Sequence, residues 1–182
     1  MSKQYEFRFG GAGGQGLMLM GDIFAEAAGT KAGKEIVLTR SYGPEARGGA
    51  CRSELIVSNH PINYPAVRNP HFVVAMSQQA CDKYHGDMDK DGTLLVDPRF
   101  VRKIPAGVKN FYSIPMTKIA EETTGSTLAS NVVAIGATAA LSGVIDIDHV
   151  KQAVLEHFKA SLRAANEKAF DAGVKAATEV RQ

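Results

Sequence analysis

Tryptophan is absent from this 182-residue chain, and its aromatic rings are confined to eight Phe and five Tyr side chains. A surface that stacks unpaired bases needs several aromatic rings, so such a surface is not expected. An excess of charge of one sign is also lacking, because 21 basic side chains balance 19 acidic ones for a net charge of +2. The composition therefore argues against a nucleic acid as the partner.

Cysteine is scarce as well, with Cys51 and Cys81 alone. Two thiols cannot supply the four thiolates that an iron–sulfur cluster usually takes, and their spacing matches no zinc motif. The histidines offer no pair at i, i+4 for a metal, since even His149 and His157 on one helix lie too far apart. We therefore expect no metal site, and we expect both cysteines to be small buried apolar residues rather than nucleophiles.

A membrane-spanning stretch is missing too. The most apolar run, Val132–Leu141, falls well short of the ~20 residues that cross a bilayer. The start of the chain, Met1–Glu6, is polar where a secretory signal would be apolar. These features predict a cytoplasmic protein with reduced thiols and no membrane contact.

What the chain does contain is typical of a single domain spanning residues 1–182. The length is close to the common domain size of ~100–150 residues, and 45% apolar and 22% charged residues are ordinary for a globular protein. Apolar periodicity separates strands from helices. The expected strands cover residues 5–9, 35–39, 50–58, 72–76, 92–96 and 110–114. The expected helices cover residues 17–32, 78–84, 131–141, 148–158 and 162–180, with Ser77 and Asn131 as N-caps.

The order of these elements predicts a three-layer α/β/α fold. The first strand, helix and second strand form a βαβ unit with a right-handed crossover. Continuous apolar strands such as Phe72–Met76 are typical of a parallel sheet that is buried on both faces. Residues 50–58 and a short extended piece that ends at Pro65, joined by a turn at Asn59–Pro61, interrupt this pattern as a hairpin. The fold class is therefore α/β, with a mostly parallel, Rossmann-like sheet and one β-hairpin excursion.

A glycine-rich loop follows the first strand and precedes the first helix. Gly11, Gly13, Gly14, Gln15 and Gly16 belong to a G-x-G-x-x-G pattern, in which backbone N–H groups and the helix dipole favour an anion. A dinucleotide site would also need an Asp or Glu at the end of the second strand. Arg40 and Ser41 stand there instead. Their presence weakens the case for NAD as the ligand but leaves NADP possible, since Arg40 could hold a 2′-phosphate. A self-sufficient NAD(P)-binding domain, a free-standing interaction module and a purely structural turn remain alternatives.

Two motifs together resemble one family. The glycine loop, running on into Leu17, and the segment Ser41–Gly49 occur in the order and at the separation found in the gamma subunit of 2-oxoacid:ferredoxin oxidoreductases, in particular the 2-oxoglutarate branch. The segment Asn131–Ala137 is similar to that family as well. The resemblance covers residues 5–158, and two long motifs in the right order are more specific than either alone.

The resemblance implies a subunit that is not active alone. Such enzymes oxidatively decarboxylate a 2-oxo acid to acyl-CoA and pass the electrons to ferredoxin. Thiamine diphosphate, Mg and iron–sulfur clusters would then be held by catalytic alpha and beta subunits and by an iron–sulfur subunit or ferredoxin, with no cofactor and no catalytic residue in this chain. The sequence agrees, since it has no G-D-G followed by a distal N-N for thiamine diphosphate.

Two site hypotheses follow from the resemblance and the loops. The glycine loop residues Gly11, Gly13, Gly14, Gln15 and Gly16 would contact coenzyme A phosphates or the backbone of a partner. The loop that holds Tyr42, Glu45 and Arg47 would dock the catalytic subunits, because a loop with an aromatic ring, a proline and charges suits an interface. A subunit made to dock should expose an apolar patch when isolated and be able to self-associate through it.

Overall fold

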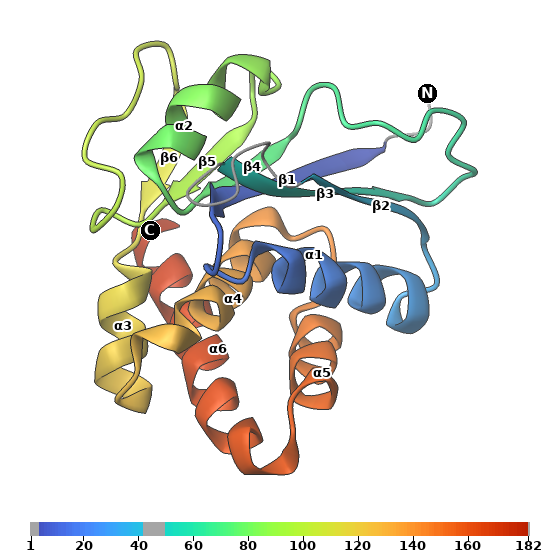
Figure 1. Cartoon of the computed structure of the whole chain (residues 1–182). Coiled ribbons are helices and arrows are strands. Elements are labelled where there is room, and N and C mark those ends of the chain that lie inside the picture. The colour runs from blue at the N-terminus through green and yellow to red at the C-terminus, as the bar shows by residue number, and fades with distance from the viewer. Residues whose placement is uncertain (1–3, 42–49, 182) are drawn as a thin grey trace.

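The computed structural model describes residues 4–41 and 50–181 of the chain, and Figure 1 shows one sheet with helices on both faces. The six strands are β1 (Tyr5–Ala12), β2 (Glu35–Ser41), β3 (Ala50–Ser58), β4 (Phe72–Ala75), β5 (Thr93–Val96) and β6 (Asn110–Ser113). The α-helices are α1 (Leu17–Glu26), α2 (Gln78–Tyr84), α3 (Met116–Thr124), α4 (Ser130–Ser142), α5 (Ile147–His157) and α6 (Ala160–Arg181). Short helical turns are η1 (Ala27–Lys31), η2 (His85–Asp87) and η3 (Thr127–Ala129).

The strand order is β2-β3-β1-β4-β5-β6. Strands β1, β4, β5 and β6 run parallel, whereas β3 is antiparallel to both β1 and β2. Strands β1 and β2 therefore share a direction, as the predicted βαβ unit requires, but β3 lies between them. The α/β fold class with a largely parallel sheet is confirmed.

The predicted hairpin between residues 50–58 and the piece ending at Pro65 is wrong. Strand β3 pairs with β1 from Tyr5↔Val57 to Ala12↔Ala50 and with β2 on its other side, while residues 61–65 form no strand. Pro61 and Pro65 lack the N–H groups that pairing between strands needs. Residues 61–65 therefore could not compete with the longer strands β1 and β2 for pairing with β3.

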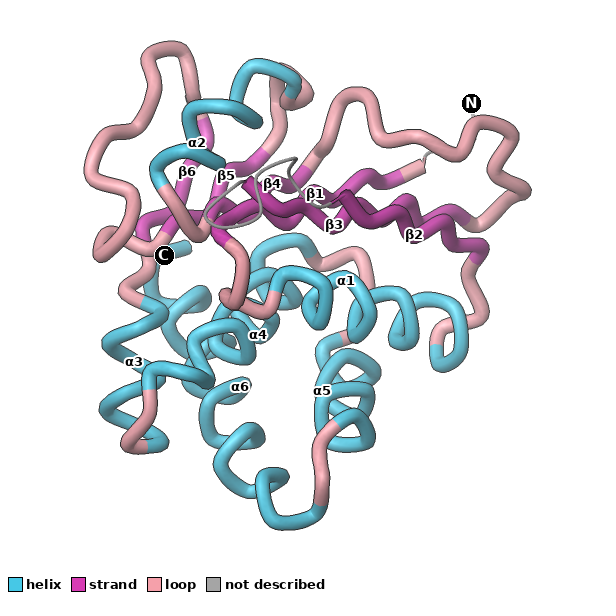
Figure 2. The backbone as a smooth tube through the Cα atoms, viewed as in Figure 1, coloured by secondary structure: helices cyan, strands magenta, loops and turns pink. Residues whose placement is uncertain are grey.

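Side chains of β1 point alternately to the two faces of the sheet and so contribute to two separate apolar cores. Phe7 and Phe9 pack against Phe24 of α1 with tilted rings, whose centroids lie 5.5 Å apart in each case. Gly10, on the other face, lies directly under the Tyr84 ring of α2. Figures 1 and 2 show α2 on that second face and α1, α3, α4, α5 and α6 together on the first. The larger apolar core therefore lies on the α1 side and the smaller one beneath α2.

A buried ion pair joins β1 to β3 on the α2 face. Arg8 is 3% exposed, and its Nε donates to Oε1 of Glu54, its cross-strand partner, over 2.7 Å. The same guanidinium donates to Asp87 over 3.0 Å and lies 5.3 Å from the centroid of the Tyr84 ring. A slip of one residue would break this pair and bury its charges unpaired, so the pair supports the observed register.

Helices α4 and α6 pack closely because each carries a glycine at the contact. A Cβ placed on Gly136 would run into the backbone of Phe170, and one on Gly173 would run into the backbone of Val133. The predicted burial of the small apolar segment 131–141 is confirmed for residues 131–139, which are all buried, whereas Ala140 and Leu141 are half-buried. This close contact holds α4 against α6.

Helix α3 was not predicted. Its nine residues include three Thr and three charged side chains, and its N-cap position is Pro115, which offers no side-chain acceptor. Local sequence signals for a helix start are therefore absent. No helix in the described part of the chain is long and apolar enough to cross a membrane.

Candidate functional site

The glycine loop lies where the direction of chain winding changes. From β1 the chain passes through α1 to β2 on one side of the sheet, and from β4 it passes through α2 to β5 on the other. The loops that follow β1 and β4 therefore diverge at the carboxyl ends of two adjacent parallel strands. In open α/β sheets this crevice is the usual place for a ligand.

The glycines of the loop differ in how much space surrounds them, since some are closely packed and others are open. Gly11 is buried, and a Cβ there would press on Gln15 and lie 3.0 Å from Cβ of Met76. Gly14 and Gly16 have φ values of 88° and 76°, which a side chain rarely tolerates. Gly13 and Gly14 are exposed, and a Cβ on either would have no neighbour within 4 Å. Gly13 and Gly14 therefore present open backbone to whatever binds.

Gln15 is turned inward. Its Oε1 accepts from the N–H of Ala12 over 2.7 Å, and its Nε2 donates to the carbonyl of Met76 over 2.7 Å. The side chain thus ties the loop to itself and to the end of β4. Gln15 therefore stabilises the conformation of the loop. A contact between the loop and a ligand stays a prediction.

Helix α1 begins at this loop without a side-chain cap. Gly16 is its N-cap residue and no acidic side chain occupies the first turn. The unpaired N–H groups of that turn and the helix dipole give a partial positive charge there. Gly16 also packs against the side chain of Asn131, so the start of α1 and the start of α4 lie together.

The prediction of Asn131 as an N-cap is wrong. Asn131 is the second residue of α4, is 8% exposed, and accepts from the N–H of Val132 over 2.9 Å. The preceding turn η3 starts earlier and is capped by Ser126, whose side chain accepts from the N–H of Leu128. Because η3 runs directly into α4, Asn131 is free of a capping role and packs against Gly16 instead.

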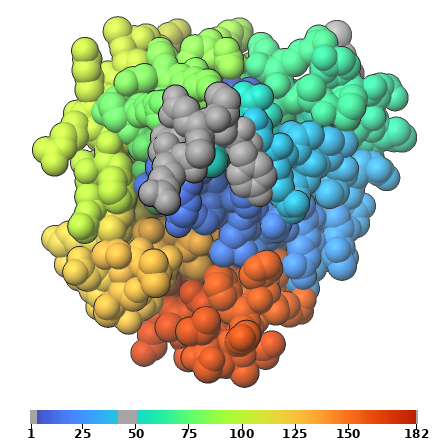
Figure 3. All heavy atoms as spheres, in the orientation of Figure 1, coloured from blue at the N-terminus to red at the C-terminus, as the bar shows by residue number. Residues whose placement is uncertain are grey.

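A cavity of about 230 Å³ opens beside the exposed part of the glycine loop. It is lined by Gly14, Gln15, Arg99, Phe100, Thr117, Thr127, Leu128, Ser130 and Asn131. Among these described residues the Arg99 guanidinium is the one full charge and there is no carboxylate. In the space-filling view the surface of residues 115–135, yellow to orange, adjoins the blue surface of the N-terminal segment (Figure 3). The cavity therefore suits an anion.

A second cavity of about 300 Å³ continues from the first and is mostly apolar. The two share Leu128 and Asn131, and the second is also lined by Phe158, Leu162 and Ala165. Leu128 is 85% exposed and Leu162 50% exposed. The combined hollow thus offers one polar, cationic end and one apolar end.

Sequence reasoning missed Arg99 and Leu128. Arg99 follows Asp97–Pro98, directly after a strand that was predicted as parallel. Its place at the carboxyl edge, the edge where ligands bind, was the available signal. Leu128 had no such signal, because the turn η3 that exposes it was not predicted.

The features expected of a nicotinamide site are not brought together. Arg40, the residue left open for a 2′-phosphate, is engaged in an ion pair with Asp22 of α1. The end of β2 is also separated from β1 by the intervening β3, whereas the dinucleotide fingerprint places these strands side by side. Among the residues that the structure describes, nothing supports the NAD(P)-binding alternative.

Of the two cysteines expected to be buried, Cys81 is buried and Cys51 is not fully so. Cys81 is fully buried in the α2 core, and burial raises the pKa of its thiol to about 11. Cys51 is half-buried on β3. Within residues 4–41 and 50–181, no group of three or more His, Cys, Asp or Glu side chains could hold a metal ion. Tyr42, Glu45 and Arg47, the predicted docking residues, lie outside the described residues.

Comparison with known proteins identifies relatives over nearly the whole length. A family model described as pyruvate ferredoxin/flavodoxin oxidoreductase matches residues 6–176. The 2-oxoglutarate synthase subunit KorC of Methanocaldococcus jannaschii is 40% identical, over 96% of this chain and 95% of that protein.

Solved structures agree with these sequence matches. The gamma subunit of a keto/oxoacid ferredoxin oxidoreductase from Geobacter sulfurreducens superposes with a TM-score of 0.89 at 40% identity, over 98% of both chains. The 2-oxoglutarate:ferredoxin oxidoreductase of Magnetococcus marinus gives a TM-score of 0.86 at 23% identity, over 98% of this chain but 32% of the other. In that enzyme the same fold is one part of a longer polypeptide.

Proposed function

The chain belongs to the pyruvate ferredoxin/flavodoxin oxidoreductase family, and from that premise we propose that it is the gamma subunit of a 2-oxoglutarate:ferredoxin oxidoreductase. The complex would remove CO₂ from the 2-oxo acid, transfer the acyl group to coenzyme A and pass electrons to ferredoxin. The observation that carries this proposal is 40% identity to a 2-oxoglutarate synthase subunit over 95% of its length.

The chain would act as a supporting subunit and not as the catalyst. Its described residues do not fit an iron–sulfur cluster, since Cys81 is buried in an apolar core and no group of metal-binding side chains is present among them. No described loop contains the thiamine diphosphate motif either. Alpha and beta subunits would hold thiamine diphosphate and Mg, and the clusters would lie in an iron–sulfur subunit or ferredoxin.

The chemistry assigned to this chain is recognition of coenzyme A as substrate. Coenzyme A carries phosphates at one end and an extended pantetheine arm. The open backbone at Gly13 and Gly14, the uncapped start of α1 and the Arg99 guanidinium surround a cavity without a carboxylate. Anions are favoured by all three features. The apolar second cavity suits the uncharged arm.

Gly13→Val tests this assignment. A Cβ added at Gly13 has no neighbour within 4 Å, and the φ of Gly13 is not positive, so the loop should keep its shape while its open face is blocked. Gly86→Val is the matched control, because Gly86 is equally open and lies in η2, away from the cavity. Calorimetric titration of the assembled enzyme should show coenzyme A affinity weakened about tenfold or more for Gly13→Val alone. Unchanged affinity together with unchanged assembly would rule out the loop as a contact.

A separate proposal concerns the segment with Tyr42, Glu45 and Arg47. We assign it to docking on the alpha and beta subunits, on the strength of its composition and of the family resemblance. Arg47→Ala should weaken association with the catalytic subunits, measured by size-exclusion chromatography of co-expressed complexes. Complexes of normal yield and size would count against a docking role.

A further inference from the structure

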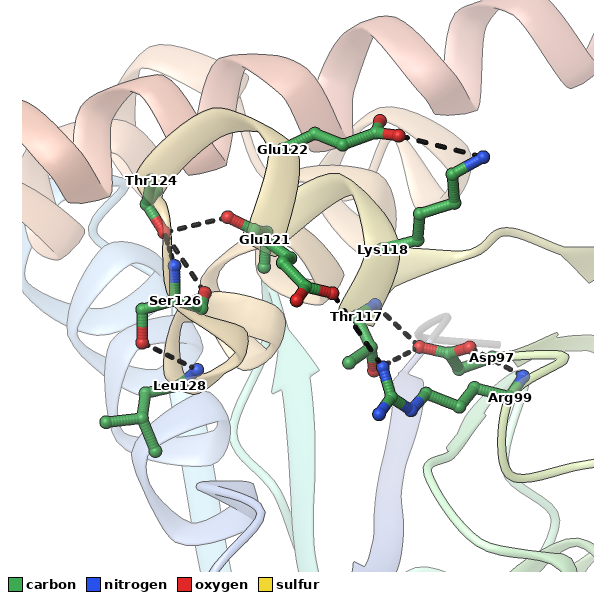
Figure 4. Close-up of polar contacts among 10 residues, drawn as sticks. Asp97, Arg99, Thr117, Lys118, Glu121, Glu122, Thr124, Ser126 and Leu128 are labelled. Carbon is green, nitrogen blue, oxygen red and sulfur yellow. Dashed lines mark hydrogen bonds and ion pairs between the residues drawn. The ribbon is translucent and has the colours of Figure 1, made fainter.

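Asp97 is a fully buried carboxylate that lies one step behind the cavity wall. It directly follows β5 and is 0% exposed. Its Oδ1 accepts from the N–H of Arg99 over 2.9 Å, and its Oδ2 accepts from the N–H and Oγ1 of Thr117 over 2.7 and 2.6 Å (Figure 4). Three donors on one carboxylate compensate its burial without an opposite charge.

The hydrogen bonds from Thr117 to Asp97 cap the N-terminus of α3. The N-cap position of α3 is Pro115, which offers no side-chain acceptor. The Thr117 N–H in the first turn is therefore an unpaired donor, and Asp97 satisfies it from the end of a neighbouring strand. Asp97 thus replaces the missing cap and joins α3 to β5.

The other half of the arrangement fixes Arg99. Besides the Oδ1 bond to the Arg99 N–H, the backbone carbonyl of Asp97 accepts from Phe100 and Val101 over 3.0 and 2.9 Å. Val101 is 4% exposed and anchors the far side of this turn in the α2 core. The Arg99 backbone is consequently held on both sides, and its guanidinium lies at the cavity, 4.0 Å from Glu121 of α3.

We propose that Asp97 is a positioning residue that places Arg99 to meet the anionic part of the ligand. The inference rests on the proposed function, in which this cavity takes the phosphates of coenzyme A. Asp97 makes no contact with the ligand, because its carboxylate is sealed behind Arg99 and Thr117. An acceptor-only group is required there: the amide of Asn would turn an N–H toward at least one of the three donors.

The test is Asp97→Asn in the assembled enzyme, with steady-state kinetics against coenzyme A and 2-oxoglutarate. Asp91→Asn is the matched control, since it makes the same chemical change at an exposed carboxylate before the other end of β5. We expect the KM for coenzyme A to rise about fivefold, with kcat and the KM for 2-oxoglutarate changed by less than about twofold. Arg99→Gln should raise the same KM, and Asp97→Asn should add little in that background, because the two substitutions remove one effect.

A merely structural role predicts another outcome. Loss of active enzyme would lower kcat and leave the KM for coenzyme A unchanged, and that result overturns the inference. If Asp97→Asn does not assemble, Thr117→Val and Thr117→Ser decide, because Ser keeps the hydroxyl donor to Asp97 and Val removes it. A raised KM for coenzyme A in Thr117→Val alone supports positioning, and equal values for the two variants overturn it.

The three substitutions Gly13→Val, Arg99→Gln and Asp97→Asn also distinguish failure of this inference from failure of the proposed function. If Gly13→Val weakens coenzyme A binding while Arg99→Gln and Asp97→Asn do not, the proposed function stands and the positioning role is refuted. If none of the three substitutions changes the response to coenzyme A, the coenzyme A assignment itself fails.

Discussion

The crossing of α4 and α6 gives the sharpest stability prediction. At Gly173 the added Cβ of alanine would meet the Val133 carbonyl group, with the carbonyl carbon at 2.9 Å and the Ala137 nitrogen at 3.1 Å. These are backbone atoms of the facing helix, so a change of rotamer cannot relieve the clash. The two helices must move apart, and this shift affects the start of α4, which lines the cavity.

The size of the effect is set by two opposing contributions. Replacing a helical glycine by alanine favours the helix by about 1 kcal/mol. Overpacking a tight contact costs about 1–3 kcal/mol, and the rigid neighbours put Gly173→Ala at the upper end of that range. The expected net loss is about 2 kcal/mol, which lowers the Tm of a chain of this length by about 4–8 °C.

Thermal unfolding followed by circular dichroism is a direct assay. Gly29→Ala is the control, because the nearest atom to its new Cβ would belong to the Ile36 side chain, at 3.3 Å, and the nearest backbone atom, the Lys34 carbonyl oxygen, would lie 3.9 Å away. This variant should leave stability unchanged or slightly raised. A Gly173→Ala variant as stable as the parent would mean that the helices do not approach as closely as described. A loss at Gly29 of the same size would attribute the effect to the substitution type instead of the crossing.

Two further predictions concern buried and half-buried ionisable groups. Glu54→Gln leaves the Arg8 guanidinium without its buried charge partner, which should lower the free energy of unfolding, measured with denaturant, by about 3 kcal/mol. Glu122→Gln, the control at an exposed ion pair, should lower it by less than about 1 kcal/mol. Equal losses for the two variants would refute the role of burial. Burial raises the pKa of Tyr5 from 10.0 to about 12, so Tyr5 ionises first in the unfolded chain. The contribution of Tyr5 to stability is therefore constant below pH 10 and falls between pH 10 and about 12. Tyr5→Phe should remove that part of the alkaline decline in Tm, and parallel pH curves for variant and parent would contradict it.

Local patterns were sufficient for most elements of this fold. The apolar run at Phe72–Met76 is buried as predicted, and the run that starts at Asn131 is buried as far as Ala139. The Ser77 cap was read correctly, since its side chain accepts from the N–H of Ala80. In each case the signal and the structure it produces lie within a few residues of one another.

The failures arise where the decisive partner is distant in sequence. Helix α3 starts without a local cap because Asp97, twenty residues earlier, supplies the acceptor. Strand β3 was assigned to a hairpin because nothing local shows that β1 will take it as a neighbour. The same reason limits the site: the glycine loop is a local motif, but Arg99, Thr117 and Leu128 join it only through the order of the strands.

The insertion of β3 beside β1 has a consequence for how the chain is made. Both neighbours of β1, namely β3 and β4, are synthesised after it. At a translation rate of about 5–20 residues per second, the Phe-bearing N-terminal strand waits on the order of seconds for either edge to be covered. Nascent gamma chains are therefore most vulnerable to aggregation before residue 58 has left the ribosome, and the N-terminal strand enters the sheet only when later segments arrive.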